Sequence, residues 1–149
     1  MTTSISNDFY TYYDWFNDVV KTEKQPIILC HASALECLEL FPGYGNEKQI
    51  DVYAKQGGAF ENIHYRIVPD FSGIETVNVD NIICTTLSQT VNDMLDEYDT
   101  MDEQALVEGL AMHYCRHGRS FSGINVKPEH HERFETIKQW ASEHFGGGY

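Results

Sequence analysis

The sequence has 149 residues, close to the commonest size of a single domain, and 42% of them are hydrophobic, which suffices for one sizeable core. Its 23 acidic against 10 basic residues give a formal net charge of −13, and such a chain is repelled by phosphate backbones and by anionic lipid. We therefore expect no direct binding to nucleic acid or to a membrane surface, and no run of apolar residues is long enough to predict a membrane span.

The first 40 residues carry two helix patterns. Apolar and aromatic residues recur at helical spacing over 8–22, and Pro26 stops this helix. Ser33 is a plausible N-cap for a short second helix, in which Leu35 points inward. Two helices are therefore predicted ahead of the strands.

Strand patterns follow. The segments 49–55 and 63–69 alternate apolar with polar residues, which is typical of half-buried strands. Residues 73–86 predict either one more strand pair around Asp80 and Asn81 or a strand and its continuation. Together these segments predict a small sheet.

Three helices are predicted in the second half of the chain. Thr86 and Gln89 fit a capping box, in which a hydroxyl and a side-chain amide satisfy backbone donors at a helix start. Thr100 and Glu103 fit a second capping box, and Pro128 suits the first turn of a last helix because its φ is fixed. The predicted inward faces comprise Leu87, Val91, Met94, Leu95 and Tyr98; Leu106, Leu110 and Tyr114; and Phe134, Ile137, Trp140 and Ala141.

These elements predict the fold class. We expect an α+β fold with two N-terminal helices, a small β-sheet and three C-terminal helices. No internal repeat or low-complexity block divides the chain, so a single domain over 1–149 is predicted, with 1–7 and 146–149 as loose termini.

The termini and the cysteines indicate the compartment. The N-terminus has neither the basic start nor the apolar core of a secretory signal. Cys30, Cys37, Cys84 and Cys115 lie among apolar neighbours without CxxC spacing, which indicates small buried thiols rather than disulfides or zinc ligands. We therefore expect a protein of the reducing cytoplasm.

The stretch 82–110 carries charge of one sign. No Lys or Arg lies between Arg66 and Arg116, whereas ten acidic residues fall in that interval. Helical periodicity predicts that the acids of the first helix in this stretch face away from its apolar side, toward solvent. One interpretation is a solvated surface, and the other is a recognition surface for a basic protein. The candidate partner-binding residues are Asp93, Asp96, Glu97, Asp99, Asp102, Glu103 and Glu108.

Two histidines have a spacing that could serve a metal ion. His113 and His117 are four residues apart on one helical face, so two imidazoles could share a zinc ion if His130 or His131 supplied a third ligand. The Glu of the H-E-x-x-H pattern is absent. The alternative is two polar residues at a helix end, where a histidine suits the helix dipole. We predict no metal site and no cofactor.

Catalytic patterns are not found elsewhere. The sequence contains no G-x-S-x-G, P-loop or G-x-G-x-x-G pattern. Cys30 and His31 are adjacent, and neighbouring side chains on a strand point to opposite faces, so they do not predict a thiol dyad. Acid–base chemistry needs a carboxyl group shifted by burial, and the acids are predicted to face solvent. We therefore predict a non-enzymatic protein without catalytic residues.

Two short blocks carry a resemblance. One is the "SAL" helix start at 33–35 ahead of the strand at 49–55, and the other is a threonine-rich segment that comprises Thr85, Thr86, Thr90, Asp93 and Leu95. Over residues 27–115 the chain resembles the core domain of the AbiEi family, the antitoxins of abortive-infection (type IV) toxin–antitoxin systems. Gln89 stands where the family often has Arg, and only 26 residues precede the matching segment, so we expect no winged helix of the kind that usually opens family members.

The resemblance implies an antitoxin-type scaffold that opposes a toxin. With the acidity, it leads us to expect a non-enzymatic antagonist that neutralises a basic toxin or nucleic-acid-handling protein. A second interpretation is a phage-type nucleic-acid mimic that inhibits a host defence nuclease, of the anti-CRISPR or anti-restriction class. A third is a metal-dependent enzyme built on the histidines.

Overall fold

The fold is taken from a computed structural model, which describes residue 23 and residues 25–43 and 49–146. Within these residues five strands form one sheet: β1 (Ile28–Leu29), β2 (Ile50–Ala54), β3 (Ile63–Ile67), β4 (Thr76–Val79) and β5 (Ile82–Thr85). The helices are α2 (His31–Cys37), α3 (Leu87–Asp96), α4 (Glu103–Arg116) and α5 (His131–Gly146), and a 3-10 turn, η1 (Pro128–His130), precedes α5.

The sheet is mixed and has the order β3-β2-β1-β5-β4. β1 runs antiparallel to β2 and parallel to β5, while β2 and β3 are parallel. β4 and β5 form the hairpin around Asp80 and Asn81, where both residues have positive φ, as a tight turn that matches the strand twist requires. The segment 73–86 is therefore a strand pair.

The predicted arrangement of two N-terminal helices, a sheet and three C-terminal helices is wrong, although the class is still α+β. Strand β1 at Ile28–Leu29 lies in the middle of the sheet, and α2 follows it, between two strands. β1 is buried on both faces, so its apolar run has no alternation by which a strand could be recognised. The helix predicted over 8–22 lies outside the described residues, as do 1–7 and 147–149, and Gly146 ends α5.

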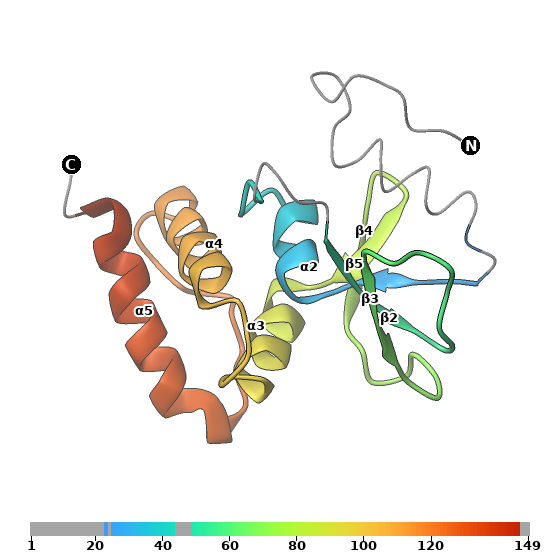
Figure 1. Ribbon diagram of the computed structural model, residues 1–149. Coiled ribbons are helices and arrows are strands. Elements are labelled where there is room, and N and C mark those ends of the chain that lie inside the picture. Colours follow the sequence, from blue (N-terminus) through green and yellow to red (C-terminus); the bar gives the residue numbers. More distant parts are fainter. Residues whose placement is uncertain (1–22, 24, 44–48, 147–149) are drawn as a thin grey trace.

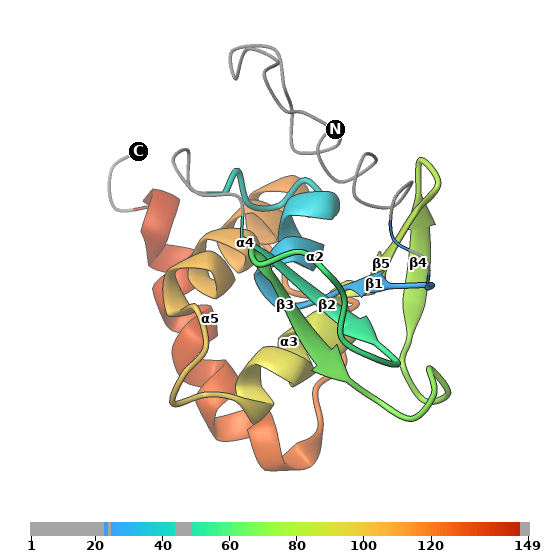
Figure 2. The same cartoon turned by 45° about the vertical axis from the view of Figure 1, so that its right-hand side comes forward.

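The helices lie to one side of the sheet, with α2 and α3 between the sheet and the α4–α5 pair (Figures 1 and 2).

Helix α2 joins two apolar cores. Ala34 and Cys37 pack with strand residues such as Val52, whereas Leu35 packs into the helical core with Leu106. Gly109 lets α4 approach α2, since a Cβ there would lie 3.1 Å from a Leu35 methyl carbon.

The helix starts were predicted in part. Thr86 is the N-cap of α3, and its hydroxyl oxygen accepts from the Gln89 backbone N–H, as predicted. The Gln89 side chain does not complete the box, because it bonds Glu75 and Asp93. The cap predicted at Thr100 is wrong: Asp102 is the N-cap of α4 and accepts from the Ala105 N–H at 3.0 Å.

Two further predictions differ from the structure. Helix α2 begins at His31, and Ser33 lies inside it, where its hydroxyl accepts from the Asp51 backbone N–H of β2 at 2.8 Å. Trp140 was predicted to point inward but is 41% exposed, because it lies at the margin of the stripe that Phe134 and Ile137 form. No helix among the described residues is long and apolar enough to cross a membrane.

Candidate functional site

The polar positions of two neighbouring strands face α3. In β2 the residues Ile50, Val52 and Ala54 are buried in the core, so Asp51 and Tyr53 lie on the opposite face. The parallel register with β3 pairs Asp51 with His64 and Tyr53 with Arg66, which places these four side chains together. The strands thus present one polar patch to the C-terminal end of α3.

Arg66 joins two carboxylates from different elements. Its Nε and Nη2 donate to the two oxygens of Glu97 at 3.0 and 2.9 Å, and its Nη1 donates to Asp51 Oδ1 at 2.8 Å. Burial alone would lower the pKa of Arg66, but these hydrogen bonds outweigh it and raise the pKa. The bidentate pair with Glu97 fixes the end of α3 against β3.

His31, the first residue of α2, completes this network, which we call the polar network: His31, Asp51, Arg66 and Glu97. It is 4% exposed, has a φ of 54°, and its Nε2 lies 3.1 Å from Glu97 Oε2. Burial lowers its pKa and the charge of Arg66 lowers it further, so the imidazole is neutral at neutral pH and donates its Nε2–H to Glu97. The second ring nitrogen, Nδ1, is buried and has no hydrogen-bond partner among the described residues.

Glu97 is therefore only partly exposed to solvent, and its carboxylate is paired with other residues of the protein. Burial alone would raise its pKa, but the hydrogen bonds from Arg66 and the neighbouring positive charge hold the pKa below its ordinary value. Two of its three donor contacts come from Arg66, which lies 31 positions earlier in the chain, and the third comes from His31, which lies 66 positions earlier. Helical periodicity cannot reveal contacts of this range. The predicted outward position of Glu97 is wrong in this respect.

Asp93 was also predicted to face solvent, and that prediction is wrong because the sheet covers this side of α3. Asp93 is only 6% exposed, and its Oδ1 accepts from the Gln89 amide at 2.9 Å. Burial raises the pKa of Asp93, although the hydrogen bonds from Gln89 and from Tyr53 act in the opposite direction.

Asp96 is exposed but compensated. Its carboxylate lies 2.6 Å from His130 Nε2 and 3.6 Å from Lys127 Nζ. The segment 125–127, which carries Lys127, is held by Asn92 of α3. The Asn92 amide donates to the Asn125 carbonyl, and its side-chain oxygen accepts from the Lys127 backbone N–H. The local lack of cations in the sequence is thus partly relieved by residues from elsewhere.

The other four of the seven predicted partner-binding acids also lie at or near the surface. Asp99 and Glu103 are exposed, and Asp102 and Glu108 are half-buried. Within the described chain no Lys or Arg ion pair reaches Asp99, Glu103 or Glu108. We call these residues the acidic segment: Asp99, Asp102, Glu103 and Glu108.

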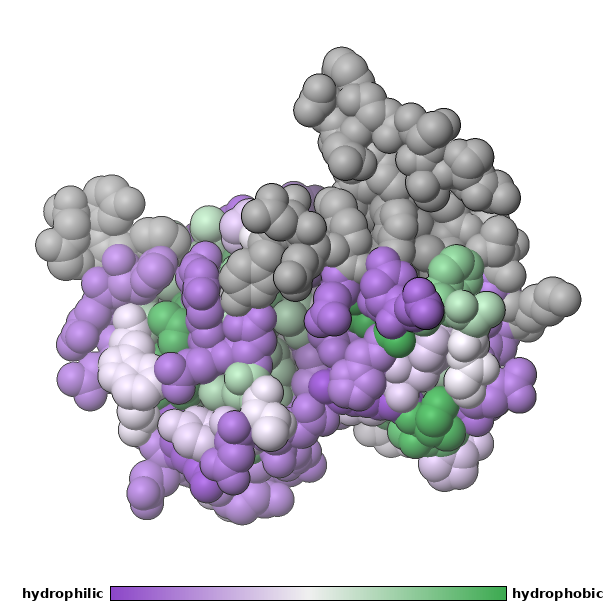
Figure 3. All heavy atoms as spheres, viewed as in Figure 1, coloured by the Kyte–Doolittle hydropathy of each residue, from purple (hydrophilic) through white to green (hydrophobic). Residues whose placement is uncertain are grey.

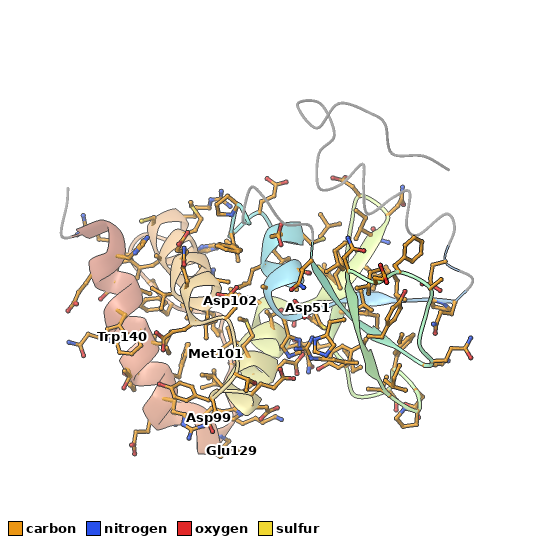
Figure 4. The ribbon with its side chains drawn as sticks, viewed as in Figure 1. Asp51, Asp99, Met101, Asp102, Glu129 and Trp140 are labelled. Carbon is orange, nitrogen blue, oxygen red and sulfur yellow. The ribbon has the colours of Figure 1, made fainter. Side chains whose placement is uncertain are left out.

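In Figure 4, Asp99, Met101 and Asp102 follow the α3–α4 connection on the face turned to the reader, and Asp51 lies across from them on the sheet. Figure 3 shows the same face covered mostly by hydrophilic residues over the helices and along their boundary with the sheet. Trp140, an exposed aromatic residue, lies on α5 (Figure 4).

A cavity of about 310 Å³ opens between the polar network and the acidic segment. Carboxylates reach it from β2, from the end of α3 and from the start of α4, against one guanidinium. Met94, Met101 and Ala32 supply apolar wall, and His31 and His64 complete it. We call this space the interface cavity; it is lined by His31, Ala32, Gln49, Asp51, His64, Arg66, Met94, Glu97, Thr100, Met101 and Asp102.

The predicted histidine pair does meet, but its ring nitrogens bond the backbone. The rings of His113 and His117 stack with centroids 3.9 Å apart. His113 Nε2 lies 3.3 Å from the Ser122 carbonyl, and His117 Nδ1 lies 2.9 Å from the His113 carbonyl. His130, the possible third ligand, is bonded to Asp96. Among the described residues no group of three or more His, Cys, Asp or Glu side chains could hold a metal ion.

Sequence reasoning missed His31, Asp51, His64 and Arg66. The sequence does carry a signal for Asp51, His64 and Arg66. They occupy the polar positions of two alternating strand patterns, which share one face of a sheet if the strands pair, and Arg66 begins the interval without Lys or Arg. Their meeting with Glu97 depended on how α3 packs on the sheet, which no local pattern encodes.

The fold and site define a small α+β protein with a mixed five-stranded sheet, an internally paired polar network and an acidic segment beside it. No family model matches the chain, and no characterised protein matches it significantly.

Proposed function

We propose that this protein is a non-enzymatic antagonist of the antitoxin kind, which binds and neutralises a basic protein partner in the cytoplasm. The observation that carries the proposal is the acidic segment, where Asp99, Glu103 and Glu108 have no Lys or Arg ion pair in the described chain. These carboxylates carry charge of one sign with no cation beside them in the described chain, and the cations of a partner would complement them.

The polar network supports a binding role rather than catalysis. All three nitrogen atoms of the Arg66 guanidinium donate to Asp51 or Glu97, and His31 donates to the same Glu97. Groups that are held by each other in this way stiffen the surface between α3 and the sheet. A rigid surface loses less entropy on binding, which favours affinity.

The resemblance to abortive-infection antitoxins supports the class of partner. A toxin or another nucleic-acid-handling protein carries basic surface that complements an acidic segment. Charge complementarity of this kind speeds association and makes it sensitive to salt.

The experiment is affinity capture from the native host with three matched baits at low and at high salt. The test variant carries Asp99→Asn, Glu103→Gln and Glu108→Gln, and it leaves the Asp102 cap intact. The control removes three exposed charges elsewhere, through Glu61→Gln, Glu132→Gln and Glu143→Gln.

A basic protein should be captured by the wild type and by the control, lost from the test variant, and weakened by salt because the Debye length falls below about 10 Å above 0.1 M. Growth arrest by that protein should be relieved by co-expression of the wild type. Equal capture by both variants would show that the acids are only a solvated surface. Displacement of the partner by duplex DNA or RNA would favour the nucleic-acid mimic instead.

A further inference from the structure

We propose that the interface cavity is a receptor for one arginine side chain of the protein partner. The inference rests on the proposed function and adds to it the chemistry of the partner residue that anchors the complex. The cavity lies between the polar network and the acidic segment, so a partner on the acidic segment would cover its mouth.

Charge favours a cation. The carboxylates of Asp51, Glu97 and Asp102 line the cavity, and Arg66 is the one guanidinium among its lining residues. Each nitrogen of Arg66 already donates to a carboxylate, so Arg66 offers little to an anion. A buried imidazole, that of His31, adds an unpaired ring nitrogen rather than a charge.

Size and wall chemistry favour a side chain over a metal ion or a nucleotide. The volume of about 310 Å³ lies at the lower end of the range of about 300–1,000 Å³ in which proteins bind small molecules. The carboxylates come from three elements, and no described group of three donors could hold a metal ion. Met94, Met101 and Ala32 suit the aliphatic stem of an arginine, whose stem packs on apolar surface while the charged end pairs.

A guanidinium fits this set of acceptors better than an ammonium. It has five donors in a rigid plane and can bond carboxylates from two directions, as Arg66 does with Glu97 and Asp51. An ammonium is a strongly hydrated point charge and would lose more hydration here for fewer directed hydrogen bonds.

The experiment is a methyl NMR titration of the protein labelled at the methionine methyl groups. The probes are N-acetyl-arginine amide and N-acetyl-citrulline amide, which differ in charge at nearly the same shape. Met94 and Met101 line the cavity, and Met112 lies at a different site between α2 and α4 and is the internal reference. The arginine probe should shift the Met94 and Met101 signals in a saturable way with a Kd of about 1 mM, and citrulline should bind at least tenfold more weakly.

The matched variants are Asp102→Asn, which keeps a capping side chain but removes the charge, and Glu129→Gln, an exposed acid that does not line the cavity. We expect Asp102→Asn to weaken the arginine probe at least threefold and Glu129→Gln to change it less than twofold. Unmoved Met94 and Met101 signals, equal binding of citrulline, equal binding of N-acetyl-lysine amide, or equal effects of the two variants would each overturn the inference.

The outcomes separate this inference from the proposed function. Partner capture that depends on the acidic segment, without saturable binding of the arginine probe, would overturn the arginine receptor alone. Saturable binding of the probe without any such capture would instead overturn the antagonist function.

Discussion

Arg66 is the residue that connects the sheet to the acidic helix. Its side chain is 17% exposed and bridges Asp51 of β2 with Glu97 at the end of α3. Removal of one partner from a buried ion pair leaves an uncompensated charge, whereas exposed pairs contribute little. The contribution of the Arg66 ion pairs to stability should lie between that of a buried pair and that of an exposed pair, because Arg66 is largely buried whereas Glu97 is 36% exposed.

We predict that Arg66→Met destabilises the fold by about 2 kcal/mol, between the roughly 0–1 kcal/mol of exposed pairs and the roughly 3–5 kcal/mol of fully buried ones. Urea unfolding followed by circular dichroism measures this. The control, Arg116→Met at an exposed position of α4, should stay within about 0.5 kcal/mol. Equal stability of the two variants would mean that the network does not fasten α3 to the sheet.

His31 makes stability depend on pH. Its pKa in the folded state lies below the ordinary 6.5, so the unfolded chain takes up a proton first as the pH falls. The free energy of unfolding should therefore be fully present above about 6.5 and decrease as the pH falls toward 5.5. Asp93, whose pKa burial raises above its ordinary 3.8, acts in the opposite direction.

The test compares urea midpoints at pH 7.5 and 5.5. In His31→Gln the loss of stability between these two pH values should be smaller than in the wild type, since one buried neutral imidazole is gone. His131→Gln, on the exposed side of α5, is the control and should keep the wild-type dependence. An unchanged pH dependence in His31→Gln would contradict the assignment.

At the scale of elements, the two helices of the acidic stretch start by different means. Thr86 caps α3 and also bonds Glu75, which ties the helix start to the residues before β4. Asp102 caps α4, and its negative charge suits the N-terminal end of the helix dipole. Thr100 instead donates to the Glu97 carbonyl in the connection.

We predict that Thr86→Ala and Asp102→Ala each destabilise the protein by about 1 kcal/mol, the usual cost of a lost N-cap. Thr100→Ala should change stability by less than about 0.5 kcal/mol, since it removes only an exposed hydrogen bond. Thermal unfolding of the three variants checks the order. A larger loss for Thr100→Ala than for Asp102→Ala would place the start of α4 at Thr100.

At the scale of the whole molecule, the net charge of −13 governs association. Phosphate backbones repel such a surface most strongly at low salt, where screening is weakest. We predict no shift of generic duplex DNA in a gel assay at about 50 mM salt and micromolar protein, concentrations at which basic proteins bind non-specifically. A distinct shifted band that salt abolishes would contradict this prediction.

Several features could be predicted from the sequence because their causes are local. The strands β2 and β3 follow from alternation, the β4–β5 hairpin from the turn residues Asp80 and Asn81, and the start of α3 from the Thr86 cap. The apolar face of α3 follows from helical spacing, and Val91, Met94 and Leu95 are buried as predicted. Each of these signals acts over a few residues, within the period of one element.

Only the tertiary structure decided where those elements meet. β1 is a central strand because β2 and β5 enclose it, and α2 lies between strands rather than ahead of the sheet. Arg66 meets Glu97 across 31 positions of sequence, and the sheet buries Asp93 although its helix position suggested solvent. The sequence by itself determined the excess of negative charge and the local elements. The position of α3 relative to β2 and β3 decided which acids are paired within the protein, because the distance between charges in space, not along the chain, sets their pairing.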